Sequence, residues 1–285
     1  MRTLIVGGGG FIGLNLAQAL LRAGRETVPF DRAVPPQALT ELRAIGPACT
    51  VVAGDVRDAG VRRVINLSSG SALGAAAFPA GGGLLDERVL PNPQSMYGIT
   101  KFASERVAAR LADLWRLDVR SVRLSAAFGP WERQTGVRST MSLQFQIALL
   151  ARAGATAILE RPCLRDCIYA PDIAQAALRL IDAPAPAHPR YNFSTAVTYA
   201  ALAWGEALAA AMPGNGFSCR LAHAGESGNV ALHGPADRAS MATARAGSDL
   251  GFTAAWGMLA SAKHYADWMR SHPWCFEAQK DGSVP

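Results

Sequence analysis

Three side chains of this sequence could carry out acid–base chemistry together: Ser69, Tyr97 and Lys101. Tyr97 and Lys101 are four residues apart, so a helix would place both on one face. The Lys101 ammonium would lower the pKa of the Tyr97 phenol from about 10 towards neutrality, which makes Tyr97 a usable general acid or base. Ser69, at the end of an expected strand, could donate a hydrogen bond to a substrate oxygen as charge develops there. Singly, each has an ordinary alternative: a surface tyrosine, a solvated lysine and a capping serine.

A glycine run near the start predicts a nucleotide-binding turn. Residues 7–13 read Gly-Gly-Gly-Gly-Phe-Ile-Gly, between a strand-like apolar run and a helical pattern. A pyrophosphate would lie against bare backbone at the positive end of that helix. An acid that binds the adenosine ribose is expected about 20 residues further on, where Asp31 stands. A carboxylate there favours NAD over NADP, although Arg32 could partly offset the repulsion of a 2′-phosphate. The candidate cofactor contacts are Gly7, Gly10, Phe11, Ile12, Gly13, Asp31, Arg32 and Lys101.

The elements that must position these groups alternate between strands and helices. Apolar runs predict strands at 3–6, 27–31, 49–53, 61–67 and 118–124, and helical periodicity predicts helices at 12–23 and 97–116. This alternation is typical of an α/β fold with a parallel sheet and helices on both faces. Beyond Pro130 the pattern changes to Ala-rich helices, which indicates a second, smaller lobe. We expect a nucleotide-binding domain at 1–130, joined again by 165–195, and a substrate-binding lobe at 131–164 and 196–285.

Composition excludes several classes of protein. No stretch of the 285 residues approaches the ~18 apolar residues of a membrane span, and the first expected strand begins at Arg2, so we expect a cytoplasmic protein. The net charge is +6, but no basic run or arginine–aromatic alternation suggests nucleic-acid binding, and a basic surface suits small anionic molecules. The five cysteines lack a Cys-x-x-Cys pair and the five histidines are scattered, which indicates reduced thiols and no metal site.

Motifs along nearly the whole chain resemble those of one enzyme family. They are the glycine run, Gly54-Asp55-Val56-Arg57-Asp58, Ser68-Ser69-Gly70-Ser71, Tyr97-Gly98-Ile99-Thr100-Lys101, residues 123–130, Arg165-Asp166-Cys167-Ile168-Tyr169-Ala170-Pro171-Asp172, Tyr191-Asn192-Phe193 and Asp249-Leu250-Gly251-Phe252. In this order they resemble an extended short-chain dehydrogenase/reductase of the NAD-dependent epimerase/dehydratase family. The resemblance implies a Rossmann fold, a Ser-Tyr-Lys catalytic set at Ser69, Tyr97 and Lys101, adenine contacts from Asp55 and Val56, and a substrate-phosphate contact at Arg165.

Departures from the family pattern narrow the expected substrate. Dehydratases of the family tend to carry Asp-Glu after the catalytic hydroxyl, whereas Gly70 and Ser71 follow here, so dehydration is disfavoured. Ala126 stands where many nucleotide-sugar enzymes have an Asn, which weakens the case for a nucleotide sugar. Arg133 and Arg138 could bind a carboxylate or phosphate, or could be ordinary surface arginines. We therefore expect hydride transfer at a hydroxyl or keto group of a small anionic sugar-type substrate, a sugar acid or a nucleotide sugar. Its contacts would be Ser71, Arg133, Arg138 and Arg165.

One stretch of the family pattern is missing. Between Asp58 and Ala59 the family has a whole strand and a long helix, and no residue intervenes here. A parallel crossover needs a dozen or more residues. The deficit has three explanations, namely a segment absent from the sequence as given, which we favour, a true deletion, and a locally rewired sheet. A true deletion would remove part of the cofactor pocket. An alternative function is therefore a catalytically degenerate sensor or scaffold protein that binds dinucleotide. The resemblance also implies a possible homodimer through the Tyr97 helix.

Overall fold

The glycine run lies between the first strand and the first helix, as predicted. The computed structural model describes residues 2–31, 34–46, 62–79, 82–134 and 141–277. Its first unit consists of β1 (Arg2–Val6), α1 (Phe11–Arg22), β2 (Glu26–Phe30) and α2 (Pro36–Ile45). β1 pairs with β2 in parallel, with Thr3 opposite Thr27. The buried face of α1 carries Leu14, Leu16, Leu20 and Leu21, which confirms the predicted helical periodicity.

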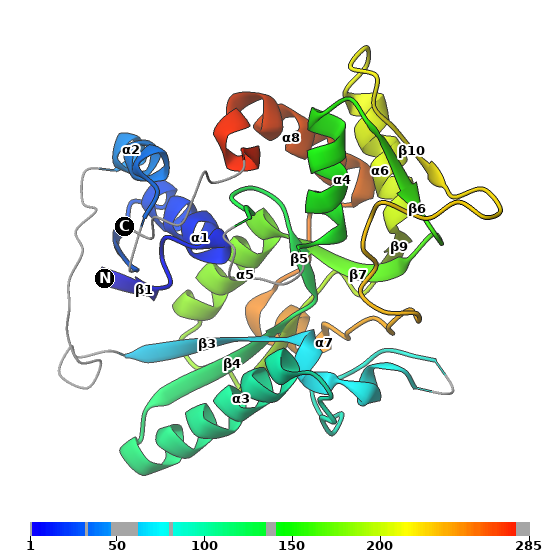
Figure 1. Ribbon diagram of the computed structural model, residues 1–285. Helices are drawn as coiled ribbons and strands as arrows, with labels where there is room; N and C mark the ends of the chain where they lie inside the picture. Colours follow the sequence, from blue (N-terminus) through cyan, green and yellow to red (C-terminus); the bar gives the residue numbers. More distant parts are fainter. Residues whose placement is uncertain (1, 32–33, 47–61, 80–81, 135–140, 278–285) are drawn as a thin grey trace.

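A second parallel ladder carries the predicted catalytic residues. Its strand order is β3–β4–β8, from β3 (Arg63–Ser69), β4 (Asp118–Leu124) and β8 (Arg190–Phe193). Helix α3 (Met96–Trp115) packs on β3 and β4, and α5 (Ala170–Asp182) packs on α1 over the other side of the sheet (Figure 1). Ser95 begins α3 because its hydroxyl accepts a hydrogen bond from the Gly98 N–H at 3.1 Å. The α/β class with parallel strands and helices on both sides is confirmed.

Among the described residues, no strand pairing joins the two ladders. Within the described residues, β1 pairs only with β2, and β3 pairs only with β4. Val6 in β1 is consequently 71% exposed, which is unusual for a strand that would lie centrally in a doubly wound sheet. The predicted strand 49–53 and the Asp58–Ala59 junction lie outside the described residues. The favoured explanation, a segment absent from the sequence as given, therefore stays a prediction.

The second lobe has its own hydrophobic core. The first core gathers residues of β1, α1, α2, β4, α5 and β8. The second gathers residues of α4 (Leu143–Arg152), β6 (Thr156–Leu159), α6 (Ala201–Ala211), β10 (Ser218–Leu221) and α8 (Met258–Ser271). Between them β5 (Ala126–Phe128), β7 (Leu164–Tyr169) and β9 (Thr198–Ala200) form a small mixed sheet. We propose two lobes on the ground of these cores, although Ala246, Leu250, Phe252 and Cys275, which the sequence analysis assigns to the substrate lobe, belong to the first core.

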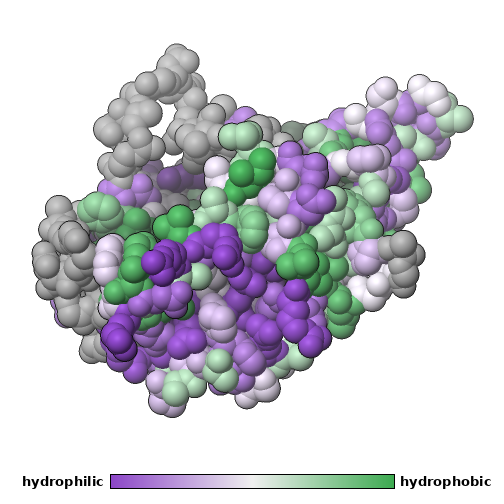
Figure 2. Space-filling view, turned by 90° about the horizontal axis from the view of Figure 1, so that it is seen from below, coloured by the Kyte–Doolittle hydropathy of each residue, from purple (hydrophilic) through white to green (hydrophobic). Residues whose placement is uncertain are grey.

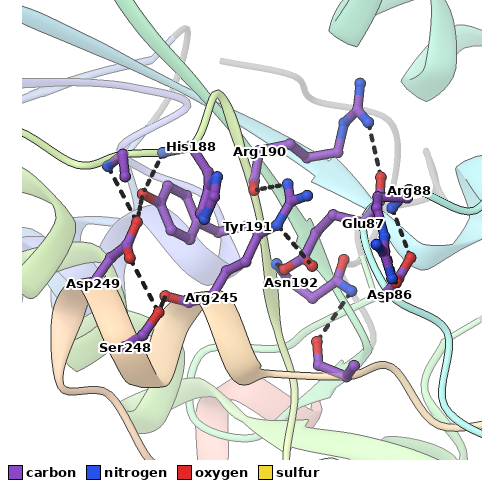
Figure 3. A network of polar contacts seen from close by, with 12 residues as sticks. Asp86, Glu87, Arg88, His188, Arg190, Tyr191, Asn192, Arg245, Ser248 and Asp249 are labelled. Carbon is purple, nitrogen blue, oxygen red and sulfur yellow. Dashed lines mark hydrogen bonds and ion pairs between the residues drawn. The ribbon is translucent and has the colours of Figure 1, made fainter.

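Short elements complete the chain: η1 (Gly70–Leu73), η2 (Ala75–Ala77), α7 (Ala244–Leu250) and η3 (Pro273–Phe276). Figure 3 shows how polar contacts fasten β8 between α7 and the loop at residues 86–88. Glu87 accepts the Asn192 N–H at 2.9 Å, and the Tyr191 hydroxyl donates to Asp249 at 2.6 Å. In the described part of the chain, no helix is long and apolar enough to span a membrane, and no cluster of three or more potential metal ligands is found.

Candidate active site

The glycine turn is shaped by close backbone approaches. Gly7 has a φ of +76°, and the N–H groups of Gly7 and Gly8 donate to Phe30 O at 2.8 and 3.1 Å. A Cβ on Gly13 would lie 2.3 Å from Gly7 O, so a side chain there would break the turn. A Cβ on Gly7, in contrast, would meet nothing within 4 Å. The bare backbone at this position therefore leaves open space in front of the α1 N-terminus.

Asp31 lies beside this turn, where the spacing predicted it. Its Oδ2 accepts a hydrogen bond from the Gly9 N–H at 3.1 Å. The acid at the end of β2 is thereby held next to the glycine run. Arg32, Asp55, Val56 and Arg138, the other residues proposed for the cofactor and the substrate, lie outside the described residues.

Tyr97 and Lys101 share one side of α3, next to the carboxyl end of β3. The Lys101 ammonium lies 5.6 Å from the centre of the Tyr97 ring and donates to Leu67 O at 2.9 Å. Tyr97 is 55% exposed. Two residues beyond Leu67, the Ser69 hydroxyl accepts the Ser71 N–H at 3.1 Å and so caps η1. Ser69 therefore caps a helix, which is the ordinary role that its sequence position also allowed. The same residue lines the cavity described below.

A buried charge cluster fastens α3 to the sheet. Glu105, one turn after Lys101, accepts the Ser68 hydroxyl at 2.6 Å and two hydrogen bonds from the Arg123 guanidinium at 2.9 and 2.8 Å. The side chains of Glu105 and Arg123 are fully buried. Burial would raise the pKa of Glu105, but the hydrogen bonds from Arg123 and Ser68 and the charges of Arg123 and Arg190 outweigh it and lower that pKa. The strand that carries Ser69 is thereby held against the helix that carries Tyr97.

The two ladders meet at one large cavity of about 1050 Å³. The carboxyl ends of β1 and β3 both line it, as expected where parallel strands of an α/β fold end. Nine predicted site residues are in its lining: Gly7, Gly10, Phe11, Ile12, Gly13, Ser69, Ser71, Tyr97 and Arg165. Asp31, Lys101 and Arg133 lie outside that lining. The cavity brings together the glycine turn and two members of the predicted catalytic set.

The far wall of the cavity is basic. Arg165 and Arg238 both line it, and Arg165 donates to His233 O at 3.1 Å. Burial and the neighbouring charge of Arg165 lower the pKa of Arg238, whose Nε is buried without a hydrogen-bond partner. Two cations that face one cavity repel each other unless an anion lies between them. Sequence analysis missed Arg238, because a single arginine in a loop has no periodicity or spacing that marks it.

Asp166 is a second cavity residue that was not proposed as a site residue. It accepts the Ser194 hydroxyl, the Met241 N–H at 2.9 Å and the Thr195 hydroxyl at 3.2 Å. Burial raises its pKa against the effect of these hydrogen bonds. Its contacts join β7 to the loop before α7, and thereby hold Arg165 and the loop of Arg238 on the same side of the cavity.

Arg133 lies against the glycine turn. Its Nη2 donates to Gly9 O at 3.3 Å, next to Asp31. The guanidinium is therefore placed against the nucleotide-binding turn, and it is not among the residues that line the 1050 Å³ cavity.

A glycine turn on a parallel α/β framework, with Ser69 and Tyr97 in the lining of the same cavity, is typical of dinucleotide-binding folds. The model of the NAD-dependent epimerase/dehydratase family matches residues 50–194, and the chain belongs to this family. The resemblance to an extended short-chain dehydrogenase/reductase is confirmed. The family consists of enzymes that depend on NAD, which agrees with the cofactor expected from Asp31.

Known proteins similar to this chain bind or convert nucleotide sugars. A UDP-glucose 4-epimerase of Mycolicibacterium smegmatis is 27% identical to this chain over 183 residues. The match covers 64% of this chain and 53% of the relative, so it spans about half the length of that relative. The solved UDP-glucose 4-epimerase of Stenotrophomonas maltophila, with NAD and formylated UDP-arabinopyranose, has a TM-score of 0.78 at 18% identity, over 96% of this chain and 99% of that one. MoeE5 with UDP-glucuronic acid and NAD has a TM-score of 0.69 at 22% identity, over 95% and 99% of the two chains.

Proposed function

We propose that this chain is an NAD-dependent epimerase or dehydrogenase that oxidises a hydroxyl of an anionic sugar-type substrate, with Ser69, Tyr97 and Lys101 as its catalytic set. One observation carries the proposal: Tyr97 and Ser69 line the same cavity as the glycine turn. A substrate hydroxyl placed between the two groups would face both a proton acceptor and a dinucleotide. The cavity volume of about 1050 Å³ is at the upper end for ligand sites, which suits a cofactor and a substrate together.

The glycine turn fits a dinucleotide. The open space at Gly7 and the N–H groups at the start of α1 would accommodate the pyrophosphate, since both the bare backbone and the helix N-terminus favour an anion. Asp31 would bind the adenosine ribose from its position beside Gly9. NAD, when bound, supplies the hydride acceptor. Phe11 and Ile12 line the cavity next to the glycines and would contact the cofactor.

The protein would move the proton. Tyr97 as phenolate takes the proton of the substrate hydroxyl, and the Lys101 ammonium 5.6 Å from its ring stabilises that phenolate. Lys101 is held in place by Leu67 O, which ties it to the strand that carries Ser69. The Ser69 hydroxyl, which accepts the Ser71 N–H, would donate its own proton in a hydrogen bond to the substrate oxygen. An epimerase would invert the reacting carbon of the sugar, and a dehydrogenase would release the oxidised product.

The substrate would bind as an anion at Arg165 and Arg238. A diphosphate or carboxylate between the two guanidinium groups relieves their repulsion and forms charge-assisted hydrogen bonds. Ser71 would contact the sugar from η1. UDP-sugars and sugar acids both satisfy this chemistry, and Ala126 in the lining offers no amide to either.

A substrate panel with Tyr97→Phe tests the function. We expect UDP-glucose, UDP-galactose, UDP-glucuronic acid or a sugar acid to be converted, with a kcat that falls roughly 10²–10⁴-fold in Tyr97→Phe. Accumulation of NADH identifies a dehydrogenase, and inversion without it identifies an epimerase. If the wild-type protein converts a substrate and Tyr97→Phe does so at the same rate, the proposed role of Tyr97 is wrong.

A dinucleotide-binding sensor or scaffold is the second candidate. The observation in its favour is that, within the described residues, no strand pairs with both β1 and β3, and Val6 beside the glycine turn is exposed. Such a protein would bind NAD with a measurable Kd and convert no substrate of the panel. The same panel therefore separates the two candidates.

A homodimer through α3 completes the proposal. Met96, Ile99, Val107 and Leu114 recur at helical spacing on the side of α3 that points away from the sheet, and all four are exposed. Figure 2 views the side of the molecule where α3 lies and shows hydrophobic areas beside a hydrophilic band. Packing two copies along this stripe would bury these side chains. We also propose a cytoplasmic location, supported by the four described cysteines, which are all unpaired.

A further inference from the structure

The segment after β5 carries a cation to the glycine turn. Arg133 donates to Gly9 O at 3.3 Å, while the N–H of the same Gly9 donates to Asp31 at 3.1 Å. A guanidinium and a carboxylate therefore flank one glycine of the turn. The Arg133 side chain is half-buried, and its burial lowers its pKa against the opposing effects of Cys275 and Asp31.

Arg133 is held there by a chain of fixed neighbours. Asn15 of α1 donates to Pro130 O at 2.8 Å, and Trp131 Nε1 donates to Gln18 of α1 at 3.3 Å. The Glu132 carboxylate is fully buried and accepts both the N–H and the hydroxyl of Ser142. The backbone before Arg133 is thus fastened to α1 on one side and to the second lobe on the other.

The backbone at Trp131 adopts a costly conformation to achieve this. Trp131 has a φ of +70°, in the left-handed region that a bulky side chain rarely adopts. Its ring packs against Trp268, His272 and Trp274 at centroid distances of 5.6, 5.3 and 6.0 Å. Strain of this kind persists where the surroundings impose it, and it is concentrated at ligand sites. Here it turns the chain so that Arg133 reaches the glycine turn.

We propose that Arg133 is a cofactor-binding residue that holds the phosphates in the adenosine-diphosphate half of the dinucleotide. The inference rests on the proposed function, from which it takes NAD as the ligand. Arg133 lies at the turn where a pyrophosphate is expected, next to the acid expected at the adenosine ribose. The substrate anion is served by the separate pair Arg165 and Arg238 in the lining of the cavity. A half-buried guanidinium with a fixed backbone loses little entropy on binding a phosphate.

Calorimetric titration of the full chain with NAD and with ADP-ribose tests the assignment. We expect Arg133→Ala to raise the Kd of both ligands about 10- to 100-fold, because one charge-assisted hydrogen bond is lost. Arg133→Lys keeps the positive charge but lacks the planar guanidinium, so its Kd values should lie between those of the wild-type protein and those of Arg133→Ala. Arg43→Ala removes an exposed arginine from the same lobe, and should change neither Kd by more than about twofold. The fitted stoichiometry of each variant reports its folded fraction.

The outcomes separate this inference from the function on which it rests. If the wild-type protein binds neither NAD nor ADP-ribose, the proposed function fails and the assignment fails with it. If the wild-type protein binds both and Arg133→Ala and Arg133→Lys bind them equally well, the assignment alone is wrong. A raised KM for the sugar substrate with unchanged Kd values would return Arg133 to the substrate site expected from the sequence.

Discussion

The buried pair of Glu105 and Arg123 gives the sharpest stability prediction. In Arg123→Met the guanidinium that donates two hydrogen bonds to Glu105 is lost, and a fully buried carboxylate is left with Ser68 and Arg190. Removing one partner of a buried ion pair costs about 3–5 kcal/mol. With a urea dependence of about 3 kcal/mol per molar, we expect the unfolding midpoint at pH 7.5 to fall by roughly 1–2 M.

The pH dependence gives the same prediction a second readout. The folded-state pKa of wild-type Glu105 lies below its usual 4.5, so its stabilising contribution is present above about pH 4.5 and is lost as pH falls through the folded-state pKa. In Arg123→Met the hydrogen bonds and the charge of Arg123 no longer oppose the effect of burial, so the pKa of Glu105 rises. Protonation of Glu105 then removes the cost of burying its charge. The difference in urea midpoint between the wild-type protein and Arg123→Met should therefore narrow as the pH is lowered towards 5.

Two further variants control the experiment. Glu105→Leu with Arg123→Met replaces the pair by apolar side chains and should recover most of the lost stability, because Arg190 is one-quarter exposed and can be solvated. Arg88→Met removes an exposed arginine paired with Asp86, and should leave the urea midpoint unchanged. Identical unfolding curves for Arg123→Met and the wild-type protein at pH 7.5 would refute the reasoning.

Two predictions concern the substrate and the dimer. Arg165→Met and Arg238→Met should each raise the KM for the sugar substrate about 10- to 100-fold and leave the Kd for NAD unchanged; a normal KM in both variants would contradict the anion site. Val107→Glu should convert a dimer into a monomer in light scattering, whereas Ala109→Glu, at an exposed position outside the stripe, should not; a dimer that survives Val107→Glu would exclude this stripe as the interface.

The strongest local signals in the sequence predicted the framework of the site. The glycine run between a strand and a helix predicted a nucleotide-binding turn, and helical periodicity predicted the helix that carries Tyr97. Each signal depends on neighbours within one turn or one strand. The helix of Tyr97, the strand before it and Asp31 could therefore be placed before any tertiary contact was known.

Other parts of the site depend on contacts between distant segments. Glu105 is indistinguishable in sequence from a solvated helical glutamate, and only Arg123 on the neighbouring strand makes it a buried anchor. The position of Arg133 is set by Asn15, Gln18 and the ring packing of Trp131, which no spacing encodes. Strands such as β5 and β9 have three residues each, too few for a period to be recognised.

In the described part of the chain, the two ladders are connected by side chains and not by paired strands. β1, α1, β2 and α2 join the rest of the described chain through side-chain packing, above all of α1 on α5, and not through a shared backbone ladder. Such a unit can open locally at a lower free energy than the whole molecule. A ligand that touches both the glycine turn and the Ser69 strand would oppose that opening by mass action. Cofactor occupancy would then control how much of the chain behaves as one cooperative folding unit.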